Sequence, residues 1–293
     1  MIIDAHNHAD WYAVTRENFV RDMDENGIDV TWLLSCEIPE GEYNPSEVSL
    51  FPCIYGTDRT CVPFERALPY VEKYPERFVL GFAPDPRRPD ALDRLKYAVK
   101  AFGVRVCGEV KFRMMLDNFD ATTLFRWCGE NGLPVTVHLD YPIPHGDGHY
   151  PRPHYWYGGD IDTLERAMIA CPDTIFLGHA PGFWCHISGD EQGITTPYPQ
   201  GKVLPGGKLL RLLDKYPNLY CDISAGSGNN ALSRDPEFAK KFLTDYADRI
   251  LYARDTFFKL HKEFLLSLGL RQEVLDKIFY KNALKLVPLK GSV

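Results

Sequence analysis

The amino-acid sequence predicts an α/β protein that folds as a (β/α)8 TIM barrel. The chain has 293 residues, and one such barrel usually takes about 250. Short, nearly continuous apolar runs, which suit strands buried on both faces, alternate with segments of helical periodicity. Repeated strand-then-helix units close naturally into a barrel, and no linker or shift in composition divides the chain. Residues 1–293 are therefore predicted to form a single domain.

The first half of the chain is predicted to contain strands at 2–8, 29–35, 78–83 and 106–112. The helices between them are predicted at 14–26, 64–74 and 90–102. Pro89 precedes the third helix and Gly103 follows it, which matches the preference for proline at a helix start and glycine past its end. Residues 36–63 lack periodicity, and a loop of this length inside a compact domain is usually functional. We therefore expect this loop to wall or cover a site.

The second half repeats the alternation, with strands predicted at 134–139, 174–179, 219–224 and 249–255. Helices are predicted at 121–131, 160–170, 207–215 and 236–247, with helical segments at 259–268 and 271–285. Loops are expected at 141–159 and 180–206. The first of these loops contains Tyr141, His145, His149, His154, Tyr155, Trp156 and Tyr157. These side chains either form a wall of the substrate site or pack the loop onto the barrel rim, and we do not assign the histidines as metal ligands.

Composition and charge argue against several classes of function. The net charge of −7, without a run of Lys or Arg, argues against sequence-independent binding of nucleic acid. No segment approaches the roughly 20 consecutive apolar residues of a membrane span, and the N-terminus lacks the features of a signal peptide. The eight cysteines include no Cys-x-x-Cys pair and are expected to be reduced and mostly buried. We expect a cytoplasmic protein that acts on a small molecule, with assembly into a homo-oligomer left open.

The strongest chemical signal is the pair His6 and His8 in the first predicted strand. Side chains two apart in a strand point to one face, so both imidazoles can bind one ion. Ile2 and Ile3 bury the start of the strand and place the pair at its C-terminal end, where ligands bind in parallel α/β folds. The alternative is a pair of surface histidines near a flexible terminus.

Further polar residues fall late in other predicted strands. They are Glu109 and Lys111 in the fourth, His138 in the fifth, His179 in the sixth and Asp255 in the eighth. Taken singly, each histidine could be a hydrogen-bonded core residue, and Asp255 could cap the next helix. Taken together at one end of a barrel, they favour a metal site. Zinc is the predicted metal because it prefers imidazole nitrogen and carboxylate oxygen, and His6, His8, His138 and Asp255 would be its ligands in a mononuclear site.

These motifs resemble the amidohydrolase superfamily, in particular its amidohydrolase-related branch, which includes aminocarboxymuconate-semialdehyde decarboxylase and 2-pyrone-4,6-dicarboxylate lactonase. The matching features are Asp-Ala-His-Asn-His at 4–8, Val-His-Leu at 137–139, Leu-Gly-His-Ala at 177–180 and Asp255. The resemblance implies that His6, His8 and His138 are metal ligands and that Asp255 is a ligand or the general base. It implies that His179 orients or deprotonates water in a one-metal site, or binds the second ion in a two-metal site.

The number of ions depends on the fourth strand. In binuclear relatives a carboxylate from this strand bridges two ions, so the resemblance makes Glu109 an occasional ligand and leaves a second ion open. Lys111 is interpreted as a substrate contact. The alternative is a Glu109–Lys111 pair that only holds neighbouring side chains in place.

Arginine residues near the site are candidates for anchoring an anionic substrate. One is Arg113. The other is Arg254, which stands where the family commonly has a small residue before the strand-eight aspartate. Arg254 is expected either to bind the substrate or to lie between the barrel and its helices.

The favoured function is a metal-dependent hydrolase that cleaves a C–O bond of a small lactone or ester, or a C–N bond of an amide. The metal would activate water, Asp255 would accept its proton, and His179 would position the nucleophile. One alternative is a decarboxylase of a small unsaturated carboxylate, which uses the same ligands and needs Lys111, Arg113 or Arg254 as an anchor. Others are a phosphoesterase barrel, whose additional histidine-rich ligands are not evident, and a non-catalytic metal-binding barrel.

Overall fold

The computed structural model describes residues 1–39, 42, 62–140, 156–190 and 192–289. The strands in these residues form two parallel runs in sequence order, β1 to β3 and β4 to β8. They are β1 (Ile3–Asn7), β2 (Val30–Leu33), β3 (Phe78–Leu80), β4 (Cys107–Val110), β5 (Val135–His138), β6 (Phe176–His179), β7 (Leu219–Asp222) and β8 (Ile250–Leu251).

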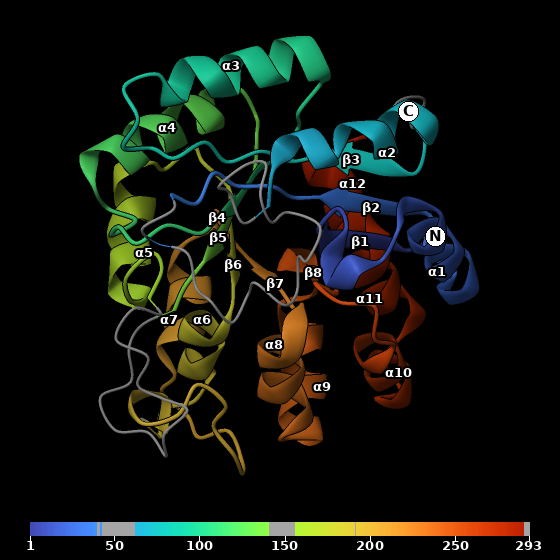
Figure 1. Cartoon of the computed structure of the whole chain (residues 1–293). Helices are drawn as coiled ribbons and strands as arrows, with labels where there is room; N and C mark the ends of the chain where they lie inside the picture. Colours follow the sequence, from blue (N-terminus) through green and yellow to red (C-terminus); the bar gives the residue numbers. More distant parts are fainter. Residues whose placement is uncertain (40–41, 43–61, 141–155, 191, 290–293) are drawn as a thin grey trace.

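Two contacts between these runs close the sheet. A parallel bridge between Gly81 and Val106 joins the end of β3 to the start of β4. The Ala5 N–H of β1 donates to the Tyr252 carbonyl just after β8. The strands therefore form a closed barrel with helices around it, which confirms the predicted TIM-barrel fold (Figure 1).

Most helices begin and end close to the predicted residues. They are α1 (Arg16–Asn26), α2 (Leu68–Lys73), α3 (Ala91–Phe102), α4 (Phe119–Glu130), α5 (Ile161–Ala170), α7 (Lys208–Lys215), α9 (Pro236–Asp245) and α10 (Leu260–Ser267). After α10 come α11 (Gln272–Asp276) and α12 (Asn282–Leu286), joined by a π-helical turn at Lys277–Lys281. The glycine signal at the end of α3 acts as expected, because Gly103 takes a left-handed φ of 71° there.

Two of the α-helices within the described residues were not predicted: α6 (Pro181–Trp184), inside the expected loop 180–206, and α8 (Ala225–Ser233). Glycine, serine and asparagine dominate α8 and have weak helix propensity. Tertiary packing stabilises this helix, since Ala231 and Leu232 are buried. A Cβ atom on Gly228 would lie 2.1 Å from the Ile223 carbonyl oxygen, so only glycine allows this close approach.

The core has an inner and an outer layer. Apolar side chains including Trp32, Leu177 and Leu251 fill the barrel, and a larger cluster packs between the strands and the helices. β1 has an irregular register against β2 between Asp4 and Asn7. Such a bulge changes which side chains face inward, so Ala5 joins the inner cluster while the next residue, His6, also faces the barrel interior.

Several sequence expectations fall on residues that the structure does not describe. Most of the loops 36–63 and 141–159 lies there, including His145, His149 and His154. The cysteines within the described ranges (Cys36, Cys107, Cys128, Cys171, Cys185 and Cys221) are buried free thiols. None of the helices described is both long and apolar enough to cross a bilayer.

Candidate metal centre

The polar residues singled out in five strand regions meet at one end of the barrel. They are His6 from β1 and His8 just after it, Glu109 from β4, His138 from β5, His179 from β6 and Asp255 just after β8. All are buried except Asp255, whose side chain is 14% exposed. The C-terminal ends of the strands bring them together, which is where barrel enzymes place their functional residues.

One group of donor atoms has the separations that a single ion requires. The Nε2 atoms of His6 and His8 are 3.3 Å apart, and His8 Nε2 lies 3.2 Å from Asp255 Oδ1. Glu109 Oε2 lies 3.6 Å from His8 Nε2 and 3.8 Å from His6 Nε2. Ligands on a tetrahedral zinc ion, with bonds of about 2.0–2.1 Å, are about 3.3 Å from one another. The spacing therefore fits a divalent cation held by nitrogen and oxygen.

The orientation of the two imidazoles supports the same conclusion. His8 Nδ1 donates to the Leu34 carbonyl at 2.9 Å, and His6 Nδ1 hydrogen-bonds Asp222 Oδ2 at 2.6 Å. In neutral rings held this way both Nε2 atoms carry lone pairs, and these face each other and a carboxylate. Such an arrangement is repulsive unless a proton or a metal ion lies among the donors. Outer hydrogen bonds of this kind commonly orient histidine ligands.

A second group shares Glu109 with the first. Glu109 Oε1 accepts a hydrogen bond from His138 Nδ1 at 2.6 Å and lies 3.8 Å from His179 Nε2. His138 Nε2 is buried without a hydrogen-bond partner among the described residues, 3.7 Å from Asp140 Oδ2. His138 is thus at the site as expected, but here its Nδ1 contacts Glu109. The donor atoms of His6, His8 and Glu109, and likewise those of Glu109, His138 and His179, lie close enough together to hold one ion.

The centre has a strong negative potential. Burial opposes protonation of His6, but nearby carboxylates, chiefly that of Asp222, outweigh it and raise the pKa of His6 to about 10. Burial also disfavours carboxylate ionisation, yet the surrounding histidines lower the pKa of Asp222 to about 2 and hold those of Glu109 and Asp255 below their usual values. The ionised carboxylates therefore create a site that favours added positive charge.

Whereas the pKa of His6 is raised, the pKa of His179 is lowered. Burial lowers its pKa to about 4, although the charge of Asp222 opposes the change. Its Nδ1 lies 2.9 Å from the Ser224 hydroxyl, and its Nε2 lies 3.7 Å from Asp255 Oδ2. His179 is therefore a neutral imidazole at pH 7, oriented from behind and facing the centre.

The backbone holds Asp255 in place. Its φ of 51° lies in the left-handed region, which aspartate tolerates better than most residues. Its N–H donates to the His6 carbonyl at 2.8 Å, and its own carbonyl accepts from Trp11 Nε1 at 2.6 Å. These bonds fix the position of the carboxylate relative to β1.

Of the expected substrate contacts, Lys111 and Arg113 lie in the segment that follows β4. Lys111 is buried, with Nζ 5.2 Å from the centroid of the Tyr157 ring, and its charge helps to lower the pKa of Glu109. Arg113 is half-buried in the segment after β4, and its backbone N–H donates to Glu42 Oε2 at 2.8 Å.

The expected substrate role of Arg254 is corrected by the structure. Its Nε donates to Asp4 Oδ2 at 2.8 Å and its Nη1 to Asp22 Oδ2 at 2.7 Å. Asp22 belongs to α1, so Arg254 lies between the barrel and its helices, which was the other interpretation of this residue. The inward position on this strand belongs to the neighbouring Ala253.

Sequence reasoning missed Asp222 and Ser224, which contact the site histidines. Both fall at the end of the predicted strand 219–224, the same kind of position that singled out the other site residues. Asp222 could have been found by this signal. Which histidines it contacts depends on how the barrel closes.

The comparisons with known proteins agree with this geometry. The family model described as amidohydrolase matches residues 57–289. The chain belongs to the amidohydrolase family. This confirms the resemblance seen in the motifs, and it does so independently of His6 and His8, which precede the matched region. A search of curated proteins finds no significant match.

Three of the solved structures that share this amidohydrolase fold illustrate its range. A TIM-barrel protein from Bordetella bronchiseptica is 17% identical, with a TM-score of 0.65 over 98% of each chain. A dihydroxybenzoic acid decarboxylase from Polaromonas, with bound manganese and the inhibitor 2-nitroresorcinol, is 17% identical, with a TM-score of 0.56 over 92% of this chain and 85% of that one. A probable 2-pyrone-4,6-dicarboxylic acid hydrolase from Acinetobacter baumannii, with citric acid bound, is 14% identical, with a TM-score of 0.56 over 97% and 98%. At these identities the similarity establishes the fold alone.

Proposed function

We propose that this amidohydrolase-family protein is a metal-dependent hydrolase that cleaves a C–O or C–N bond in a small lactone, ester or amide. The observation that carries the proposal is the cluster of buried donor atoms from His6, His8 and Glu109, which lie 3.3–3.8 Å apart. Asp255 Oδ1, which is partly exposed, lies 3.2 Å from His8 Nε2. Imidazole nitrogens and ionised carboxylates suit a divalent ion, and we propose zinc. Such an ion, when bound, polarises a carbonyl and lowers the pKa of water.

The protein's own groups supply the remaining chemistry. Asp255 is ionised, borders the donor cluster and is partly exposed, so it can accept a proton from water and return it to the leaving group. His179 is neutral and fixed by Ser224, so it can orient the nucleophile through its Nε2. Lys111 brings a buried positive charge near Glu109 and is proposed to contact a substrate oxygen.

A decarboxylase is the second candidate. Lys111 gives the site a cation that can bind a substrate carboxylate, and a decarboxylase is among the solved structures that share the fold. Arg113, close to the same strand end, is a further candidate anchor. The two reactions can share one set of metal ligands, so the products must decide between them.

Metal content tests the centre, and product analysis tests the reaction. Elemental mass spectrometry on protein purified without chelator should find about one ion per chain, or two if both donor groups bind. The ion should be lost in His6→Ala and Asp255→Ala and kept in His186→Gln, since His186 lies outside the cluster. A loss of one of two ions in Glu109→Ala would identify Glu109 as a bridge.

The metal-loaded protein should then release acid from members of a lactone, ester and amide panel in a pH-stat. Carbon dioxide release from unsaturated carboxylates, without hydrolysis, would replace the hydrolase proposal by the decarboxylase. A wild-type chain that binds no metal under any loading condition would overturn both. Metal binding without activity on any panel would favour a non-catalytic barrel.

A further inference from the structure

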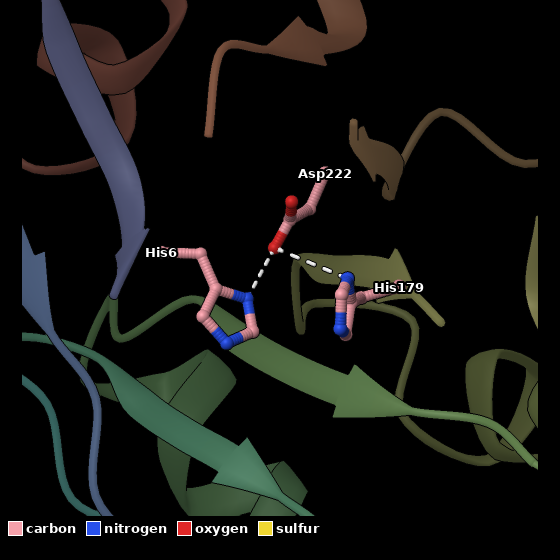
Figure 2. A group of neighbouring side chains, drawn as sticks. All are labelled: His6, His179 and Asp222. Atoms are coloured by element: carbon pink, nitrogen blue, oxygen red, sulfur yellow. Dashed lines mark hydrogen bonds and ion pairs between the residues drawn. The ribbon is translucent and has the colours of Figure 1, made fainter. Parts of the chain in front are cut away.

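The carboxylate of Asp222 lies between two histidines from distant parts of the chain. Its Oδ2 is 2.6 Å from His6 Nδ1 and 3.9 Å from His179 Nδ1 (Figure 2). Asp222 and His6 are fully buried and His179 is 1% exposed, so no solvent weakens these interactions. Asp222 is the last residue of β7, whereas the histidines belong to β1 and β6.

The position of Asp222 is itself fixed. The Ser224 N–H donates to its Oδ1 at 2.8 Å, and Trp184 Nε1 donates to its backbone carbonyl at 3.0 Å. The same Ser224 hydroxyl contacts His179 Nδ1. Asp222 is therefore a fixed hydrogen-bond acceptor. Its Oδ1 is occupied by the Ser224 N–H, and its Oδ2 faces the histidines.

The short contact with His6 excludes Asp222 and His6 Nδ1 as ligands of one ion. Two ligand atoms on the same tetrahedral ion lie about 3.3 Å apart, while 2.6 Å is the length of a charge-assisted hydrogen bond. Because Nδ1 is engaged, Nε2 of His6 is the atom left for the donor cluster, 3.3 Å from His8 Nε2.

We propose that Asp222 is a positioning residue of the metal centre: through its hydrogen bond to Nδ1 it selects Nε2 of His6 as the ligand atom. This inference rests on the proposed metal-dependent function. Without Asp222 the His6 ring loses the bond that fixes its orientation, and either nitrogen can then face the cluster. His179 keeps Ser224, so its orientation should suffer less than that of His6.

The test compares four variants by metal affinity instead of activity alone. Asp222→Ala removes both the charge and the acceptor, and Asp222→Asn keeps an acceptor of the same shape without the charge. Asp22→Asn is the matched control, a partly buried carboxylate that pairs with Arg254 and not with a site histidine. Ser224→Ala removes only the hydroxyl contact to His179.

Zn²⁺ and Co²⁺ dissociation constants would be measured by competition with a chelator. Asp222→Ala should bind both ions about 10–100-fold more weakly, the usual cost of losing such an outer partner, and Asp222→Asn should lose less. The visible absorption of saturated Co²⁺ protein should change in Asp222→Ala and stay unchanged in Asp22→Asn. Ser224→Ala should keep the wild-type metal affinity and lower kcat.

The outcomes separate this inference from the proposed function. Wild-type protein that binds metal, together with unchanged affinity and Co²⁺ spectrum in both Asp222 variants, would overturn the positioning role and leave the metal centre intact. Wild-type protein that binds no metal would overturn the function itself. Circular dichroism identifies a variant that fails to fold, and the isosteric Asp222→Asn then carries the comparison.

Discussion

At the scale of single residues, the surroundings of His6 show that the centre favours added positive charge. Its Nδ1 is bound to Asp222, and its Nε2 faces a histidine nitrogen across 3.3 Å. A pKa of about 10 means that metal-free protein keeps a proton on this ring at neutral pH. A proton and a metal ion both neutralise the negative charge around His6. They therefore compete for this site.

This competition predicts proton release on metal binding. At pH 7.5 the folded metal-free protein carries the His6 proton, and a metal ligand must give it up. Isothermal titration calorimetry in two buffers of different ionisation heat should show about one proton released per ion, with apparent affinity rising from pH 7 to pH 9. No proton release, and an affinity independent of pH, would contradict the protonation of His6.

The raised pKa of His6 also makes the stability of the metal-free fold depend on pH. Because the folded pKa is raised above the ordinary 6.5, protonation of His6 stabilises the metal-free fold. That contribution is complete below pH 6.5 and is lost as the pH rises toward 10. Urea unfolding of metal-free protein should therefore show decreasing stability across this window, with a smaller decrease in His6→Gln.

At the scale of elements, an ion pair ties β8, β1 and α1 together. Arg254 follows β8 and is 1% exposed, and its partners Asp4 and Asp22 lie in β1 and α1. This pairing turns the arginine away from the barrel interior, while the bulge in β1 turns His6 toward it. The two effects place the candidate metal-binding side chains on one side of the barrel wall and the Arg254 ion pair on the other.

Removal of this arginine should affect stability and not substrate binding. Arg254→Met would leave Asp4 and Asp22 without their cation and should lower the free energy of unfolding by about 3 kcal/mol, measured with urea. Arg254→Lys should lose less because it retains a charge. At a temperature where both variants are folded, KM should stay near the wild-type value. A rise in KM at unchanged stability would restore the substrate role.

At the scale of the whole molecule, the centre joins parts of the chain that are far apart in sequence. Its donor residues come from β1, β4, β5 and β6 and from the segments just after β1 and β8. An ion bound to them would link the N-terminal and C-terminal strands of the barrel. It would lie near the point where β1 and β8 close the sheet. Metal binding should therefore stabilise the entire fold and not one loop.

Calorimetry can measure this coupling. An ion that binds only the folded chain, at 1,000 times its Kd, adds about 4 kcal/mol to the free energy of unfolding. Treatment with EDTA should accordingly lower Tm by roughly 6 °C. His6→Ala should have a lower Tm than the wild type and show no further decrease with EDTA. Equal melting with and without EDTA in the wild type would speak against a structural link through the ion.

The sequence by itself determined the alternation of strands and helices, the barrel and most of the polar residues that meet at one end of it. Apolar runs and helical periodicity depend on local residue order, and parallel strands carry their functional side chains at one end whatever the details of packing. His6, His8, Glu109, His138, His179 and Asp255 could be selected on this ground. That the chain folds as a single domain stays a prediction.

Only the tertiary structure decided the direction and the partners of these side chains. The inward turn of His6 follows a bulge in the pairing of β1 with β2, and the outward turn of Arg254 follows its contact with Asp22 on α1. Asp222 is 216 positions from His6 along the chain, so no local pattern could pair them. Helix α8 forms against its own weak propensity because buried contacts outweigh it. These features depend on contacts between residues distant in sequence, which arise only once the barrel has closed.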